Sequence, residues 1–221
     1  MKTGVIILAR ANYGRWPDKV LYKLQGKTIL EHVITKAQQL NVDHVIVSTT
    51  CNIEDQPIRE IIVKTNCDYC LGDPEDRCIR HYEAIQRYNL DYFLSQSPAA
   101  PFFDVDYTNR LISAFRIHPG YDYYNTGGYN RSYIPLVISN SVVEKRIAQK
   151  DRDNELFVDP HGNRKTFTLY NWADKEIRNR YLFDGNIAYK IQAENHRKIC
   201  EYLGHFPKDY DEIVTALLEM E

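Results

Sequence analysis

Three cationic side chains follow a short apolar run near the amino end of the chain. The run, residues 5–8, has the composition of a buried strand, and Arg10, Arg15 and Lys19 come directly after it. Glycine and proline lie among these cations, so the segment is predicted to form a loop. Fixed positive charges beyond the carboxyl end of a first strand suit the binding of a polyphosphate. A solvated basic loop that pairs with surface carboxylates is the alternative interpretation.

The overall composition is that of a folded protein with a small-molecule partner. The 221 residues are 43% hydrophobic and 26% charged, which is enough apolar material for a sizeable core. A formal net charge of −2 without any run of Lys or Arg argues against a nucleic-acid or anionic-membrane surface. The first apolar run is too short for a signal-peptide core or a membrane span, so a cytoplasmic location is predicted.

Apolar runs and amphipathic segments alternate along the first half of the chain. Strands are predicted at residues 5–8, 43–50, 67–71 and 91–95, and helices at 29–40, 57–64 and 76–88. This alternation predicts an α/β fold with a mostly parallel, Rossmann-like sheet and helices on both faces. Beyond residue 121, two Tyr-rich segments around a Gly-Gly turn predict an added antiparallel hairpin. No repeat or linker interrupts the chain, so residues 1–221 are predicted to form a single domain.

The cysteines are predicted to be free thiols, because five cysteines are an odd number in a chain without a secretion signal. Two pairs have the ligand types of a zinc site, namely Cys67 with Cys70 and Cys78 with His81. Residues three apart on a strand point to opposite faces of a sheet, however, so Cys67 and Cys70 are poorly placed to share a metal ion. Small buried hydrophobic residues are the favoured interpretation.

The amino-terminal segment resembles the cytidylyltransferase family that includes the CMP-sialic acid and CMP-3-deoxy-octulosonate synthetases. The resemblance is strongest to the spore-coat polysaccharide biosynthesis branch, where Ala-Arg-x-x-Ser-x-Arg-Leu-Pro-Gly-Lys follows the first strand. Here the segment reads Ala9-Arg-Ala-Asn-Tyr-Gly-Arg-Trp-Pro-Asp-Lys19. All three cations match, while Tyr13 and Asp18 replace the usual Ser and Gly. The resemblance continues through residues 26–34 and 47–58.

A second segment, residues 72–84, is similar to the family's Gly-Ser-Glu-Asp-Asp-Val-Leu-x-Arg-Tyr-Tyr-Glu-Ala. In the family the acidic loop and the Arg of this segment face the nucleotide, which implies that Asp76 and Arg80 lie near the base. The resemblance as a whole implies a nucleotide-binding set of Ala9, Arg10, Asn12, Gly14, Arg15, Lys19, Asp76 and Arg80, in a nucleotidyltransferase-type fold. It also implies a homodimer.

The activity that this resemblance implies is transfer of a cytidylyl group from CTP. A hydroxyl or phosphate of a surface-glycan sugar attacks the α-phosphorus, and pyrophosphate leaves. Negative charge builds on the phosphate oxygens during the reaction, so cationic groups are required to stabilise it. In addition to cationic side chains, such reactions usually employ Mg²⁺ held by carboxylates. Arg10, Arg15 and Lys19 are therefore the expected catalytic residues, and CTP or another nucleotide and a sugar are the expected partners.

The metal site is where the sequence departs from the family. After the fourth strand the branch has Thr-Gly-Asp-x-Pro-Leu-Ile-Asp, and Ala99 stands in the place of the first, metal-binding Asp. The remaining candidates for a Mg²⁺ ligand are Asp104, Asp106 and, in the segment where the second carboxylate is expected, Asp184. Asp104 precedes an apolar helical pattern and is equally suited to cap that helix.

Three hypotheses follow from this departure. The first is an active cytidylyltransferase whose metal site is rebuilt from Asp104, Asp106 or Asp184. The second is a catalytically degenerate protein that binds a nucleotide, a nucleotide-sugar or a partner enzyme without turnover. The third is a nucleotide-sugar-dependent glycosyltransferase that uses the Asp104-x-Asp106 pair.

Overall fold

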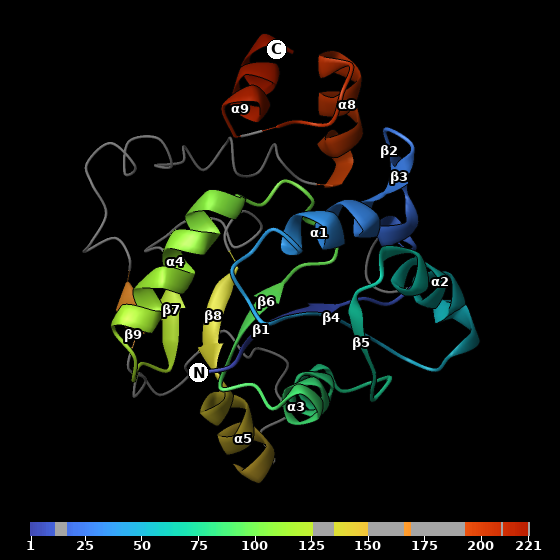
Figure 1. Cartoon of the computed structure of the whole chain (residues 1–221). Helices are drawn as coiled ribbons and strands as arrows, with labels where there is room; N and C mark the ends of the chain where they lie inside the picture. The colour runs from blue at the N-terminus through green and yellow to red at the C-terminus, as the bar shows by residue number, and fades with distance from the viewer. Residues whose placement is uncertain (12–16, 126–134, 150–165, 169–192, 209, 221) are drawn as a thin grey trace.

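A seven-stranded mixed sheet forms the centre of the protein (Figure 1). The computed structural model describes residues 1–11, 17–125, 135–149, 166–168, 193–208 and 210–220. The sheet order is β5-β4-β1-β6-β8-β7-β9. The strands are β1 (Thr3–Leu8), β4 (His44–Thr49), β5 (Asp68–Leu71), β6 (Tyr92–Gln96), β7 (Tyr123–Asn125), β8 (Leu136–Ser139) and β9 (Thr166–Thr168). A separate small hairpin pairs β2 (Lys23–Leu24) with β3 (Lys27–Thr28).

The pairing of the strands confirms the predicted sheet. β1 runs parallel to β4 and β6, and β4 runs parallel to β5, as expected from strands joined by helical crossovers. β8 is antiparallel to both β6 and β7, which confirms an antiparallel addition in the second half. The predicted Gly-Gly turn lies outside the described residues. Because the carboxyl ends of the parallel strands meet at one edge, the loops that follow β1, β4, β5 and β6 share that edge.

Helices cover both faces of the sheet (Figure 1). On one face lie α1 (Ile29–Ala37), α2 (Gln56–Thr65) and α4 (Val105–Ile117), and on the other α3 (Arg77–Tyr88) and α5 (Asn140–Gln149). Residues of α8 (Ala193–Leu203) and α9 (Tyr210–Glu219) also pack into the hydrophobic core on the α1 face of the sheet. Short 3-10 helices, η1 (Lys19–Leu21) and η2 (Ile53–Asp55), complete the architecture. No helix in the described part of the chain has the length and hydropathy that crossing a bilayer requires.

The first strand is apolar throughout because both of its faces are covered. Val5 and Ile7 pack into the core on the α1 face, whereas Ile6 packs into the core on the α3 face. All three side chains are 0% exposed. This two-sided burial explains why the strand reads as a continuous apolar run rather than as an alternating pattern.

The three cysteines of the possible zinc site occupy ordinary packing positions. Cys70 on β5 and Cys78 on α3 are buried in the core on the α3 face, and Cys67 packs against the opposite core. The two faces therefore separate Cys67 from Cys70, as the strand spacing predicts. Within the described ranges, no group of three or more His, Cys, Asp or Glu side chains is arranged to hold a metal ion.

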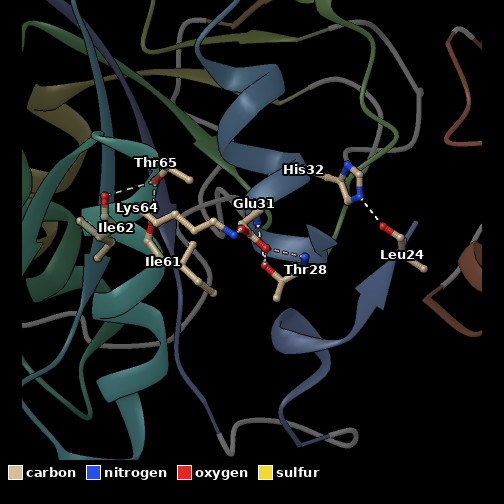
Figure 2. A network of polar contacts seen from close by, with 8 residues as sticks. All are labelled: Leu24, Thr28, Glu31, His32, Ile61, Ile62, Lys64 and Thr65. Atoms are coloured by element: carbon tan, nitrogen blue, oxygen red, sulfur yellow. Dashed lines mark hydrogen bonds and ion pairs between the residues drawn. The ribbon is translucent and has the colours of Figure 1, made fainter. Parts of the chain in front are cut away.

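A polar network fixes the start of α1 and ties it to α2 (Figure 2). Thr28 Oγ1 accepts a hydrogen bond from the Glu31 amide at 3.1 Å, and Glu31 Oε2 accepts one from the Thr28 amide at 2.6 Å. This reciprocal capping box satisfies two backbone donors at the helix start. Lys64 of α2 reaches across, with its Nζ 2.6 Å from Glu31 Oε1. One carboxylate thus joins β3, α1 and α2.

Glu31→Gln is expected to lower the free energy of unfolding near neutral pH by about 1–2 kcal/mol, because it removes a charged hydrogen bond whose lysine partner is well solvated. Burial raises the pKa of Glu31, but hydrogen bonds from Lys64 and Thr28 outweigh burial and lower the pKa from 4.5 to about 2. The contribution is therefore present above pH 4.5 and is lost as the pH falls towards about 2. Urea unfolding at a series of pH values measures the loss.

A matched control for this variant is Glu60→Gln on α2. Glu60 is exposed and accepts a hydrogen bond only from the Gln56 side chain among its described contacts, at 3.1 Å. The control is expected to change stability by less than about 0.5 kcal/mol. Equal losses in the two variants would contradict the structural role given to Glu31.

Candidate functional site

The chain that leaves β1 is held in place by a buried carboxylate. The Ala9 amide donates to the Ser48 carbonyl at 3.0 Å, which extends the pairing of β1 with β4. Two residues further on, the Ala11 amide donates to Asp55 Oδ1 at 2.7 Å. Asp55 is 1% exposed and also accepts a hydrogen bond from the Thr50 hydroxyl. A buried carboxylate with these donors fixes the backbone where the cationic loop begins.

The loop after β4 is fixed by an arginine. Arg59 Nη1 donates to the carbonyls of Thr50 and Asn52, at 2.9 Å each. The Asn52 amide in turn donates to Thr50 Oγ1 at 3.1 Å. These contacts keep the residues around Asp55 in one arrangement, so the anchor for the amino-terminal loop is itself held by its neighbours.

Arg10 connects the loop after β1 to the loop after β5. Its Nη1 donates to the Pro74 carbonyl and lies 4.0 Å from Glu75 Oε1. The Arg10 side chain is 18% exposed, whereas that of Glu75 is 86% exposed. The ion pair with Glu75 therefore contributes little, and the carbonyl contact sets the position of the guanidinium. One cation of the predicted triad is thus held at the carboxyl edge of the sheet.

The segment after β5 is a compact acidic turn. Asp73 Oδ1 accepts hydrogen bonds from the amides of Glu75 and Asp76, at 2.8 and 2.7 Å. Glu83 of α3 reaches back, and its Oε2 accepts a bond from the Asp73 amide at 3.0 Å. A Cβ on residue 72 would lie 2.2 Å from this Glu83 oxygen, so a larger residue there would displace the Glu83 side chain. The turn presents its Pro74 carbonyl to Arg10.

Asp76 and Arg80, predicted to lie near the base, have structural contacts of their own. Asp76 Oδ1 accepts hydrogen bonds from the amides of Cys78 and Ile79 and so caps the start of α3. Arg80 lies one turn further along the helix and is 2% exposed, and its carbonyl accepts a bond from Ser48 Oγ at 3.5 Å. Both residues are next to the acidic turn that holds Arg10. Their contact with a nucleotide stays a prediction.

His81 fixes α3 against β6 beneath this turn. Its Nδ1 donates to the Arg77 carbonyl at 2.9 Å, so the neutral ring accepts from the Ser95 hydroxyl through Nε2, at 3.3 Å. Burial is the main cause that lowers the pKa of His81, and the charges of Arg77 and Arg80 lower it further, from 6.5 to about 3. The imidazole is consequently neutral and serves packing rather than proton transfer near neutral pH.

Lys19 follows the loop at the start of η1 and is half-buried. The residue before it, Asp18, has a left-handed backbone with φ of 56°. The family pattern has Gly at this position, and Asp is among the few other residues that adopt this conformation readily. The replacement of Gly by Asp therefore preserves the turn before Lys19. Three predicted site residues, Asn12, Gly14 and Arg15, lie outside the described residues.

Two of the metal candidates, Asp104 and Asp106, lie at the amino end of α4. Asp104 Oδ1 accepts a hydrogen bond from the Tyr107 amide at 2.7 Å and caps α4, as its position in the sequence also suggested. Asp106 is an exposed residue of the first turn of α4. Ala99 offers no ligand atom, and Asp184 lies outside the described residues. Mg²⁺ is usually bound through one or two carboxylates together with substrate phosphates, so its binding by Asp104, Asp106 or Asp184 stays a prediction.

Gln96 is a buried polar residue at the end of β6 that sequence reasoning did not single out. It ends β6, pairs with Ile7 of β1, and is 2% exposed. Its Nε2 donates to the carbonyls of Ser97 and Ala100, at 3.1 and 3.2 Å, so the amide orientation is settled. Its Oε1 has no hydrogen-bond partner among the described residues. A buried acceptor at the ligand edge of the sheet needs a donor, and a polar residue that ends an apolar strand is the sequence signal for it.

Comparisons with known proteins agree with this architecture. The profile of the cytidylyltransferase family matches residues 4–216. An uncharacterized protein of Methanocaldococcus jannaschii is 28% identical over 127 residues, which cover 57% of this chain and 52% of that protein. The 3-deoxy-manno-octulosonate cytidylyltransferase 2 of Hydrogenovibrio crunogenus is 24% identical over 176 residues, which cover 77% of this chain and 64% of that protein. The chain thus spans less than two thirds of the length of these relatives.

Solved structures establish the fold. A cytidylyltransferase from Leptospira borgpetersenii superimposes with a TM-score of 0.80 at 20% identity, covering 100% of this chain and 95% of that one. A CMP:2-keto-3-deoxy-manno-octonic acid synthetase, solved in complex with CTP, superimposes with a TM-score of 0.60 at 16% identity, covering 76% and 90%. With the family profile matching nearly the whole chain, this protein belongs to the cytidylyltransferase family.

Proposed function

We propose that this protein transfers CMP from CTP to an acidic or other surface-polysaccharide sugar and releases pyrophosphate. The observation that carries the proposal is the placement of Arg10 at the carboxyl edge of the sheet, held by the Pro74 carbonyl. In open α/β sheets this edge is where ligands bind. Family membership and the CTP complex of the structurally similar synthetase support the choice of nucleotide.

In the proposed reaction a hydroxyl oxygen of the sugar bonds to the α-phosphorus of CTP, and the proton of that hydroxyl is released to water. The bond from the α-phosphorus to the bridging oxygen breaks, and pyrophosphate leaves with the electron pair of that bond. Negative charge rises on the leaving group, and the guanidinium of Arg10 together with Arg15 and Lys19 neutralises it. Asp55 contributes by accepting the hydrogen bond from the Ala11 amide, which fixes the backbone where the cationic segment leaves β1.

The side-chain oxygen of Gln96 is a proposed acceptor for the substrate in this reaction. Its carbonyl oxygen is the one polar atom of the side chain that the neighbouring segment does not use, because both of its amide hydrogens are taken up by Ser97 and Ala100. A fixed acceptor of this kind suits a hydroxyl group of a bound substrate. The acceptor would position that hydroxyl and give the buried oxygen its missing donor.

A protein that binds the nucleotide without turnover is the second candidate function. The observations in its favour are Ala99, which has no ligand atom, and the engagement of Asp104 as the cap of α4. Cations alone suffice for binding a triphosphate, whereas turnover in this family calls for carboxylates that hold Mg²⁺. The two functions therefore differ in how CTP binding depends on the metal.

Calorimetric titration with CTP, UTP and CDP, each with and without Mg²⁺, separates the two functions. The proposed transferase binds CTP more tightly than UTP, and Mg²⁺ strengthens CTP binding to the wild-type protein. In a binding protein, CTP affinity is the same with and without Mg²⁺, and Ala99→Asp introduces Mg²⁺ dependence, since residue 99 follows β6 at the edge where the parallel strands end. Ala99→Asn is the matched control, because it has the size of Asp without the charge. The binding-protein pattern would overturn the proposed turnover.

A further inference from the structure

A pocket lies on the α1 face of the sheet. It is enclosed by the carboxyl end of α1, the amino end of α4 and the segment that precedes α9, all on the same side of the sheet (Figure 1). Its volume is about 180 Å³. The residues that give it chemical character are Lys36, Phe102, Phe103, Asp104, Asp106 and Lys208. None of the described residues around Arg10, Pro74 or Gln96 lines it.

Lys36 is the cation inside this pocket. Its Nζ lies 5.4 Å from the centre of the Phe103 ring, and it makes no hydrogen bond or ion pair of 4.0 Å or less with any described residue. Burial lowers the pKa of Lys36 to about 8, while the charge of Asp104 raises it against burial. The ammonium is thus charged at neutral pH, largely removed from water, and without a direct counter-ion in the part of the chain that the structure describes. A ligand anion would supply one.

The other polar groups of the pocket restrict which anion fits. Asp104 and Asp106 place carboxylate groups at its wall, which repel multiply charged anions and accept hydrogen bonds from hydroxyl groups. Lys208 lies at the rim, with 76% of its side chain exposed, and pairs with Glu212 at 3.4 Å. Lys36 is therefore the cation that would bind an anionic group, and the charge balance favours a ligand with a single negative charge.

The size of the pocket restricts the ligand further. At about 180 Å³, the pocket is smaller than most sites for larger ligands. Pockets for drug-sized ligands and cofactors usually measure about 300–1,000 Å³, so a nucleotide does not fit. Phe102 and Phe103 line one side and offer apolar surface to the carbon atoms of a ligand. The pocket suits a short molecule with one anionic group, several hydroxyls and a carbon face.

We propose that this pocket binds a small polyhydroxy monocarboxylate, a short sugar acid, at a place separate from the nucleotide site. The carboxylate pairs with the Lys36 ammonium, and the hydroxyl groups donate to Asp104 and Asp106. The carbon chain lies against Phe103. The Lys36 ammonium and the exposed Asp106 carboxylate carry the polar part of this binding.

Calorimetry with L-threonate, in the absence of any nucleotide, tests the site independently of the proposed transferase activity. Threonate is expected to bind, whereas threitol, which lacks the carboxylate, and butyrate, which lacks the hydroxyls, bind at least about tenfold more weakly. Lys36→Met is expected to weaken threonate binding at least about tenfold, as for loss of a charged hydrogen bond. The matched control Lys208→Met changes it less than about threefold, because that lysine is exposed and already paired.

Several results would overturn the proposal. They are absence of threonate binding to the wild-type protein, equal binding by Lys36→Met, an effect of Lys208→Met as large as that of Lys36→Met, or equal binding of inorganic phosphate and threonate. Because Lys36 packs on Phe103, its variant is checked by thermal unfolding. The exposed substitution Asp106→Ala gives a second test, since it removes the acceptor for a hydroxyl group and is expected to lower the preference for threonate over butyrate.

Discussion

Arg10→Met is expected to weaken CTP binding by about 1.5–3 kcal/mol, which corresponds to about 10–150-fold in the dissociation constant. The guanidinium is held at the carboxyl edge of the sheet by the Pro74 carbonyl, so it is in place before the nucleotide arrives. The methionine side chain keeps the packing of the aliphatic stem and removes the charge. Arg15→Met is expected to have an effect of the same size. Calorimetric titration with CTP measures both.

The control for these variants is Arg87→Met. Arg87 is exposed on α3 and stacks on Tyr69 at the outer edge of the sheet, 5.3 Å from the ring centre, far from the loop after β1 in the strand order. CTP affinity is expected to stay within about twofold of the wild-type value in this variant. Unchanged CTP affinity in both Arg10→Met and Arg15→Met would contradict a phosphate-binding role for the segment after β1.

Mild acid is expected to destabilise the protein through His81. Its pKa is about 3 in the folded protein against 6.5 for an ordinary histidine, because burial disfavours the charged ring. The unfolded chain therefore binds a proton that the folded protein excludes, so stability is lost as the pH falls from 6.5 towards 3. The slope from this group is about 1.4 kcal/mol per pH unit. Urea unfolding between about pH 7 and 5, above the range where most carboxylates titrate, measures the slope.

His81→Gln isolates this contribution. Glutamine has a hydrogen-bond donor and acceptor but no proton to gain, so the variant is less stable near neutral pH and its stability depends less steeply on pH. The difference between the two slopes is expected to be about 1.4 kcal/mol per pH unit. His205→Gln is the control, since His205 is 44% exposed, and its slope is expected to match the wild type. A His81→Gln slope equal to that of the wild type would show that the histidine is not held neutral.

The strands and helices of the first half could be predicted from the sequence because their apolar residues repeat with clear periods. The helix predicted at 57–64 is α2 at Gln56–Thr65, and the strand predicted at 43–50 is β4 at His44–Thr49. Burial on both faces makes each inner strand of the parallel sheet a continuous apolar run, which sets strands apart from the amphipathic helices between them. The sheet class followed from this alternation.

The site was harder to predict because one residue type serves two purposes. An Asp before a helix is a good cap and also a good ligand, and the structure shows Asp76 and Asp104 as caps. The anchoring role of Asp55 depends on the Ala11 amide, 44 residues away, and no local pattern encodes that distance. The orientation of the Gln96 side chain is set by the two carbonyls that accept its amide hydrogens, and these contacts are not visible in the sequence. Long-range pairing of this kind appears only in the folded protein.

The measurement that tests the transferase proposal most directly is phosphorus NMR of CTP mixed with the protein, Mg²⁺ and an acidic sugar. N-acetylneuraminate and 3-deoxy-octulosonate are the first sugars to offer, because the family resemblance points to acids of this class. The proposal predicts pyrophosphate and a CMP-sugar in equal amounts, with formation slowed by Arg10→Met and unaffected by Arg87→Met. Binding of CTP without pyrophosphate release, with every acidic sugar offered, would contradict it.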